Sequence, residues 1–426
     1  MSRITIIGAG ITGITTAYTL VKLGYRVTVI DKSRYAAMET SFANGGQLSA
    51  SNAEVWNSTA TVLKGLRWIG KRNAPLLLNP SVSWHKYSWM AAFIRNISNH
   101  KKNTIETTRL AIEARKHLFA MAEEENIQFD LERKGILHIY HDKPSFEKAL
   151  QSNKLLQDGG LERYAVSKEE ARSIEPALVK NFYAGLYTPS DATGDIHKFT
   201  TGLASACARL GVEFVMDTTV TDIKRHNATY QIFTRQGDNT QTGILETDML
   251  VVCAGVHSKA IASLLGDSMN IYPVKGYSIS VHLDDAKSQA ATPKVSLLDE
   301  DAKIVTSHLG DRFRVAGTAE FNGFNKDIRA DRIQPLVDWV RHLFPDIATE
   351  RVVPWCGLRP MMPDMMPRVC RGKQPGVFYN TGHGHLGWTL SAATAQMLAG
   401  LVQASEPAGK PGVAGPGVVN SPVVHG

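Results

Sequence analysis

The N-terminal segment alternates between two hydrophobic patterns. Residues 3–7 are a short β-branched run, and a second run covers residues 25–30 and ends at Asp31. Between these runs, apolar side chains recur at helical spacing, at Ile14, Ala17, Tyr18 and Val21. Gly24 then supplies a helix stop. The pattern predicts a strand, a helix and a second, parallel strand within roughly 30 residues.

Two later segments have the same character. Residues 248–255 form a buried strand pattern that ends in the small residues Ala254 and Gly255. Residues 377–381 predict another strand, followed by a glycine-rich loop and a helix over 389–402. The apolar part of this last segment, 386–402, is shorter than the roughly 20 residues of a membrane span, so a buried helix is predicted. Residues 271–320 alternate between apolar and polar positions, which predicts antiparallel strands.

The glycines between the first strand and its helix suit a phosphate-binding turn. Gly8 permits the tight turn, Gly10 lets a pyrophosphate approach the helix N-terminus, and Gly13 lets helix and strand pack closely. Asp31 is placed to accept hydrogen bonds from ribose hydroxyls and would repel a 2'-phosphate. The unit therefore predicts a dinucleotide site that disfavours NADP.

Three strand-to-glycine units lie at the start, middle and end of the chain, and all could line one elongated ligand. NAD enzymes usually complete their cofactor domain in one continuous stretch, whereas extended FAD is gathered from distant segments. The spacing favours FAD, and a nicotinamide-linked dehydrogenase of hydroxy acids is the alternative.

Composition narrows the class of protein. The chain has 426 residues, of which 43% are hydrophobic and 20% charged, as in ordinary globular proteins. The formal net charge of +7 is spread too thinly to indicate nucleic acid, but it suits an anionic substrate, cofactor or membrane surface. The four cysteines have neither disulfide nor metal-ligand spacing, so we predict a reducing compartment and no metal site. No signal-peptide pattern precedes residue 3, which predicts a cytoplasmic protein.

Five blocks together carry a family resemblance. They are Gly8-x-Gly10-x-x-Gly13 with Asp31-Lys32, and the segments 39–47, 272–278, 357–361 and 380–389. With these blocks in this order, the chain resembles the FAD-dependent D-amino acid dehydrogenases, which share a superfamily with glycine oxidase and D-amino acid oxidase. The likeness extends from residue 1 to about 403.

The resemblance implies a two-domain α/β protein with FAD as cofactor. A Rossmann-like FAD-binding domain is expected from residues 1–85, 155–270 and 351–405. A second, α+β substrate domain on an antiparallel sheet is expected from 86–154 and 271–350, and 406–426 is expected to be a disordered tail. The predicted cofactor contacts are Gly8, Gly10, Gly13, Asp31, Lys32, Thr40, Ser41, Asn44, Gly45, Gly46, Gln47, Ala254, Gly255, Gly382, His383, Gly384, Leu386, Gly387, Trp388 and Thr389.

The implied reaction is oxidation of a free amino acid, most often a D-amino acid, to an imino acid that hydrolyses to a 2-oxo acid and ammonia. The Cα hydrogen would leave as a hydride to flavin N5. Arg359 is predicted to bind the substrate carboxylate, since a guanidinium does so with two parallel hydrogen bonds. Tyr277 is a candidate second contact, with packing in the sheet as its alternative, and His383 is a candidate donor or positive charge near the flavin. No general base is assigned.

Residues 62–90 interleave tryptophans with basic residues. This pattern suits a membrane interface, and a surface helix packed on the core is the alternative. The resemblance implies a quinone or respiratory-chain electron acceptor and peripheral attachment to the inner face of a bacterial inner membrane. Oxygen is the alternative electron acceptor.

One residue departs from the family pattern. Met365 stands where the family motif that contains Arg359 usually continues with glycine. If that glycine adopts a positive φ, Met365 would force a changed turn. Two further readings therefore stay open: oxidation of another small amine, such as glycine, sarcosine, proline or hydroxyproline, and a flavin-binding subunit with impaired catalysis.

Overall fold

The predicted N-terminal unit is the centre of a six-stranded sheet. The computed structural model describes residues 2–68, 76–237 and 242–406. The strands follow the order β19 (Arg368–Arg371), β20 (Val377–Thr381), β13 (Met249–Val252), β1 (Arg3–Ile7), β2 (Arg26–Ile30) and β9 (Glu213–Val215). All neighbours pair in parallel except β19 and β20. The three distant segments predicted to share one sheet do so.

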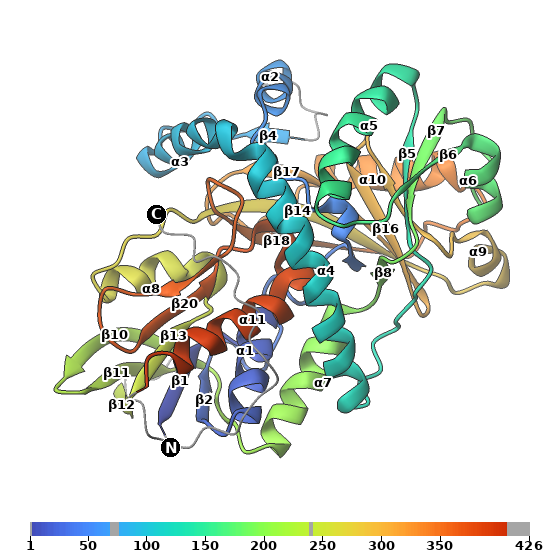
Figure 1. Ribbon diagram of the computed structural model, residues 1–426. Coiled ribbons are helices and arrows are strands. Elements are labelled where there is room, and N and C mark those ends of the chain that lie inside the picture. The colour runs from blue at the N-terminus through green and yellow to red at the C-terminus, as the bar shows by residue number, and fades with distance from the viewer. Residues whose placement is uncertain (1, 69–75, 238–241, 407–426) are drawn as a thin grey trace.

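The two faces of this sheet are covered by different elements, as strand alternation requires. Ile4 and Ile6 pack with four helices, which are α1 (Ile11–Lys22), α4 (His100–Glu124), α7 (Ile196–Arg209) and α11 (Gly387–Gln403). Ile7 packs on the opposite side, with α8 (Ser258–Leu264) and a three-stranded sheet. That sheet is formed by β10 (Thr218–His226), β11 (Thr229–Gln236) and β12 (Thr242–Thr247). Figure 1 shows these layers around β1.

A nine-stranded sheet forms the second lobe. Its order is β18 (Val352–Met361), β14 (Tyr272–His282), β17 (Arg312–Phe321), β16 (Ile304–Leu309), β15 (Ser296–Asp299), β5 (Ile136–Tyr140), β7 (Ala184–Thr188) and β6 (Tyr164–Ser167), with β4 (Leu76–Leu78) paired to β17. Most pairs are antiparallel, as predicted, although β15 with β5 and β17 with β4 are parallel. Helix α10 (Ala330–Leu343) covers one face, and Leu336 and Val340 are fully buried there. This lobe also contains α5 (Lys143–Asp158), α6 (Lys168–Ile174) and α9 (Ala286–Ala291) (Figure 1).

The observed strand pairing corrects the predicted domain boundaries. β4, β6, β7 and β18 all belong to the second sheet, although their residues were expected in the FAD-binding domain. The chain therefore crosses between the lobes more often than predicted: β4, β7 and β18 pair with β17, β5 and β14 of the second sheet, and β6 pairs with β7. A two-stranded pairing of β3 (Gln47–Leu48) with β8 (Ala192–Thr193) marks one such crossing. Residues 407–426 of the predicted tail lie outside the described residues.

Two helices project beyond both sheets. They are α2 (Thr59–Trp68) and α3 (Trp84–Arg95), which lie together with β4 at one edge of the molecule (Figure 1). Within the described part of the chain, no helix combines the length and the apolar character that crossing a bilayer demands.

Candidate active site

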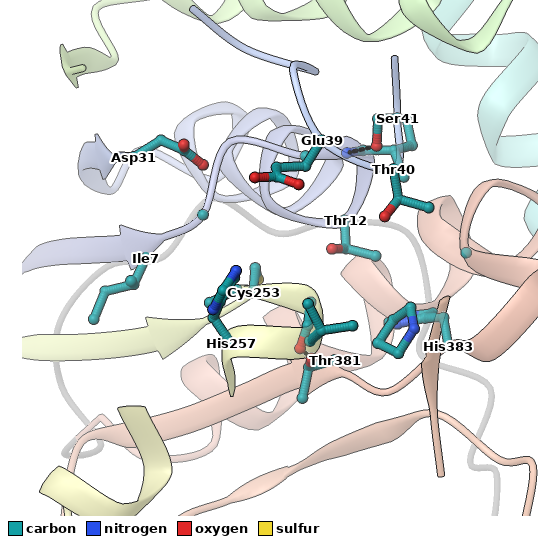
Figure 2. A pocket seen from close by; sticks show the side chains of 18 of the residues that line it. Ile7, Thr12, Asp31, Glu39, Thr40, Ser41, Cys253, His257, Thr381 and His383 are labelled. Carbon is teal, nitrogen blue, oxygen red and sulfur yellow. Dashed lines mark hydrogen bonds between the residues drawn. The ribbon is translucent and has the colours of Figure 1, made fainter. Parts of the chain in front are cut away.

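A cavity opens between the two lobes, where the C-terminal ends of β1, β2, β13 and β20 meet the end of β18. Figure 2 shows Asp31, Glu39, Thr40 and Ser41 on one side of it and Cys253, His257, Thr381 and His383 on the other. The predicted residues that line it are Gly8, Gly10, Asp31, Lys32, Thr40, Ser41, Asn44, Ala254, Gly255, Arg359, Gly382, His383, Gly384, Gly387 and Trp388. The structure therefore brings all three predicted glycine units to one place.

The first glycine turn has the geometry that close approach of a phosphate requires. Gly8 has φ +115°, and a Cβ added to it would lie 2.5 Å from the carbonyl oxygen of Cys253. A Cβ on Gly13 would lie 1.8 Å from the carbonyl oxygen of Gly8, so Gly13 serves packing of helix on strand and does not line the cavity. Helix α1 begins without a side-chain cap, although Ser41 Oγ accepts a hydrogen bond from the Ile11 amide at 3.0 Å. Its open N-terminus suits a pyrophosphate.

The ribose end of the cavity is built around Asp31. Its carboxylate accepts hydrogen bonds from the amides of Ala9 and Ser33, both at 2.7 Å, which fixes it at the end of β2. The wall opposite was not predicted, and it comes from Thr218, Thr219 and Val220 of β10 and from Val256, His257, Ala260 and Ile261. The residues after Gly255 follow a predicted strand-to-glycine turn, so their place at the cavity could have been predicted. The β10 residues belong to no such motif and line the cavity only because the three-stranded sheet packs against the cofactor lobe.

Arg359 enters the cavity from β18. Its Nη1 donates to the carbonyl oxygen of Thr318 at 3.1 Å, and in the described part of the chain it forms no ion pair with an acid. Burial lowers the pKa of this guanidinium to about 10, which leaves it cationic at neutral pH. A partly buried cation without a counter-ion is costly unless an anion binds, so this position suits a carboxylate ligand.

Tyr277 does not reach this cavity, which corrects its predicted role. The guanidinium of Arg359 lies over Gly276, since a Cβ added to Gly276 would lie 2.4 Å from Nη2 of Arg359. Successive residues of a strand point to opposite faces. The next residue of β14, Tyr277, therefore points to the opposite face, where it packs in the core beneath α10 and its hydroxyl donates to Glu320 at 2.5 Å. The position of Tyr277 matches the alternative prediction, in which its side chain packs in the sheet.

His383 is held as a neutral side chain. It lines the cavity, but its ring is buried and its Nε2 lies 2.9 Å from Thr394 Oγ1. Burial lowers the pKa of His383 to about 3, so it does not supply the predicted positive charge near neutral pH. The N-terminus of α11, where Gly387 and Trp388 line the cavity, places the positive end of a helix dipole there instead.

Five further predicted cofactor contacts do not line the cavity. Gly45 and Gly46 pack against β16, since an added Cβ would lie 2.7 Å from Val305 or 2.8 Å from Ser307. Gln47 donates to Ser296 Oγ at 2.8 Å and is buried between the lobes. Leu386 is part of a buried apolar cluster, and Thr389 Oγ1 accepts from the Ser49 amide at 3.3 Å. In the structure these residues pack loops against the sheets, and their predicted cofactor contacts stay predictions.

The Met365 turn keeps the backbone conformation that favours glycine. Met365 has φ +64°, and its side chain is buried against Val55, Trp89 and Tyr272. The expected change of turn is therefore absent, and the chain tolerates the conformation because Asn57 donates to the Pro363 carbonyl at 2.8 Å. The strain of this positive φ lies outside the residues that line the cavity.

The fold and the cavity define an FAD-dependent oxidoreductase. The family model described as FAD dependent oxidoreductase matches residues 3–401, and the chain belongs to that family. This membership decides between FAD and NAD. The glycine turn, the helix N-terminus and Asp31 would hold the pyrophosphate and ribose of such a cofactor, since all three line or frame the cavity.

The chain is 60% identical over 408 residues to "D-amino acid dehydrogenase 3" of Mesorhizobium japonicum, covering 96% of this chain and 98% of that protein. It is 38% identical over 416 residues to a D-amino acid dehydrogenase of Paramagnetospirillum magneticum, covering 94% of each. The fold is similar to that of glycine oxidase from Geobacillus kaustophilus, with a TM-score of 0.74, 21% identity and coverage of 96% of both chains. L-proline dehydrogenase from P. horikoshii gives a TM-score of 0.72 at 17% identity, covering 96% of this chain and 94% of that one.

Proposed function

We propose that the protein catalyses FAD-dependent oxidative deamination of a D-amino acid to a 2-oxo acid and ammonia. The observation that carries this proposal is Arg359, a cation that lines the cavity without an acidic partner among the described residues. The names of the relatives at 60% and 38% identity supply the substrate class.

The roles follow from chemistry and position. FAD supplies the hydride acceptor that the reaction needs. Arg359 binds the substrate carboxylate, and Thr318 holds one of its nitrogens so that the opposite edge of the guanidinium remains available. Two lobes that meet around the cavity limit the access of water, which strengthens this charge pairing.

Anaerobic mixing with amino acids tests the proposal. The FAD-loaded enzyme is mixed with a panel of D- and L-amino acids, glycine, sarcosine, proline and hydroxyproline, and the loss of oxidised flavin absorbance is followed. We expect D-amino acids to bleach the flavin fastest. Bleaching only by an L-amino acid or another amine would overturn the substrate assignment, and no bleaching by any member would overturn catalysis itself.

Arg359→Ala tests the residue, with Arg371→Ala as its control. Arg371 is exposed on neighbouring β19 and donates only to the Leu401 carbonyl among the described contacts. We expect Arg359→Ala to raise the apparent KM by about 100-fold or more, because a charge-assisted pair is lost. An unchanged KM would remove Arg359 from the site.

We also propose that the electrons pass to a membrane quinone, with the protein bound peripherally to the inner face of a bacterial inner membrane. Apolar side chains stand exposed at the edge formed by α2 and α3: Val82 is 91% and Trp84 85% exposed, and Tyr87 and Ile94 lie nearby. Exposed Arg95, Lys101 and Lys102 follow in the chain and suit anionic headgroups. Of the predicted stretch 62–90, residues 69–75 lie outside the described residues.

Vesicle sedimentation tests this attachment. We expect binding to vesicles that contain anionic lipid, weaker binding to zwitterionic vesicles, and loss of about tenfold in affinity for Val82→Ser with Trp84→Ser. Val179→Ser, which changes an exposed apolar residue elsewhere, is the control. Equal binding of both variants would reject the edge as the contact, and oxygen uptake faster than quinone reduction would reject the acceptor.

A further inference from the structure

His385 lies in the loop between β20 and α11 and lines the same cavity as Arg359. Its ring stacks on Trp56, with centroids 4.6 Å apart and planes 24° apart. Its Nε2 lies 3.2 Å from the carbonyl oxygen of Asn52. Because a carbonyl can only accept, Nε2 carries the proton, and in the neutral ring Nδ1 is left as an acceptor.

That acceptor has no partner in the protein. Nδ1 of His385 is buried and forms no hydrogen bond with any described residue. Burial and, to a smaller extent, the positive charge of Arg359 lower the pKa of His385 to about 4, so the ring is neutral at neutral pH. A buried acceptor without a donor is energetically unfavourable, and a ligand that brings a donor would remove this cost.

The tautomer is fixed by the turn that presents the Asn52 carbonyl, the short helix η1 (Ala50–Asn52). Asp191 accepts the amides of Ala50 and Ser51, both at 3.0 Å, and is itself paired with Arg115 at 2.6 Å. These contacts hold η1 in place. His385 therefore presents an acceptor, rather than a donor, on its free side.

We propose that His385 Nδ1 accepts a hydrogen bond from the α-amino group of the substrate while Arg359 binds its carboxylate. The inference rests on the proposed function. The pairing is complementary in polarity, since the guanidinium offers only donors and the imidazole nitrogen only a lone pair. Two substituents of Cα are thereby held at once, which orients the hydrogen that leaves. His385 acts as an acceptor and not as a base, because so weak a base does not take a proton from an ammonium group.

The test compares a ligand that has an amino group with one that lacks it. Dissociation constants for D-alanine and for propionate are measured on the FAD-loaded enzyme, from anaerobic flavin reduction and from perturbation of the flavin spectrum. His385→Phe keeps a ring to stack on Trp56 but removes the acceptor. We expect His385→Phe to raise the dissociation constant of D-alanine about tenfold and to leave the dissociation constant of propionate within about twofold of the wild-type value.

Two variants separate this role from a structural one. His385→Asn places an amide oxygen near the position of Nδ1 and is expected to restore most of the D-alanine affinity. His197→Phe is the matched control, since His197 also has an unpaired, buried Nδ1 but does not line the cavity. Equal weakening of D-alanine and propionate in His385→Phe, or unchanged D-alanine binding, would overturn the inference. If wild-type protein is reduced by no amino acid, it is the proposed function that fails.

Discussion

At the scale of single residues, Gly276 decides where the guanidinium of Arg359 lies. A Cβ at this position would fall 2.4 Å from Nη2 and 2.6 Å from Cζ, well inside contact distance. The obstructed atoms are the far end of a flexible side chain, so Gly276→Ala would move the guanidinium rather than unfold the sheet. We expect a 10- to 100-fold rise in KM for the amino acid with little change in Tm, measured by steady-state kinetics and thermal melting.

Gly65→Ala is the control for this change, since its Cβ would meet only Leu76 Cδ2 at an ordinary 3.6 Å. Full activity of Gly276→Ala would show that the guanidinium can bind from another position.

Met365 sets two residue-scale effects against each other. Replacing it with glycine relieves a positive φ, which stabilises by about 1 kcal/mol, but removes a buried side chain, which costs about 2–5 kcal/mol. The loss of buried packing outweighs the relief of strain, so we expect Met365→Gly to lower the free energy of unfolding by about 1–4 kcal/mol in urea denaturation. At exposed Asn227, with φ +56°, the same replacement removes no buried group and is expected to change stability by less than about 0.5 kcal/mol. A stabilised Met365→Gly would mean that strain outweighs packing.

The residue scale also shows where sequence reasoning stopped. Gly8, Gly10 and Asp31 were predictable because a short motif carries their whole geometry. The position of Tyr277 was not predictable from its motif. The motif places Tyr277 next to Gly276, but only the register of β14 on β18 decides which of the two faces the cavity. His385 was visible as a loop histidine, but its free acceptor depends on the Asn52 carbonyl, far away in the sequence.

At the scale of elements, the turn η1 is held by a buried charge pair. Asp191 has a fully buried side chain and pairs with Arg115 at 2.6 Å while accepting two η1 amides. Asp191→Ala would leave a largely buried guanidinium and two amides without an acceptor. We expect a loss of about 3–5 kcal/mol in the free energy of unfolding, measured by chemical denaturation.

The matched control is Asp346→Ala, which breaks the exposed pair with Lys287 at 2.8 Å. Exposed pairs contribute about 0–1 kcal/mol, so a small change is expected. Similar losses in both variants would mean that Asp191 does not anchor η1.

Element types were easier to predict than their partners. The parallel strands and the antiparallel region follow from local hydrophobic patterns, and each was found. The short strands β4 and β7 lie in the second sheet because they pair with the distant strands β17 and β5, for which a few residues of sequence give no signal, and β6 joins the sheet by pairing with β7.

At the scale of the whole molecule, three buried histidines link stability to pH. Burial lowers the pKa of His138 and of His385 to about 4 and that of His383 to about 3, so all three stay neutral in the folded protein. An unfolded histidine has a pKa of about 6.5. Between about pH 6.5 and 4 the unfolded chain therefore binds more protons than the folded one, and the free energy of unfolding falls as the pH falls.

Each such histidine contributes a slope approaching about 1.4 kcal/mol per pH unit, or about 4 kcal/mol for the three together. Urea denaturation of the FAD-saturated protein at pH 7, 6 and 5 measures this slope. Carboxylates with lowered pKa values, such as Glu39 and Asp299, lose their contribution only below about pH 4.5, outside this window. His138→Gln keeps a polar group near Glu300 and Ser51, which His138 contacts at 2.9 and 3.1 Å, and is expected to reduce the slope by up to about 1.4 kcal/mol per pH unit. A stability that does not change between pH 7 and 5 would mean that these rings take up protons in the folded state, and that the acceptor at His385 is not the neutral imidazole on which amine binding depends.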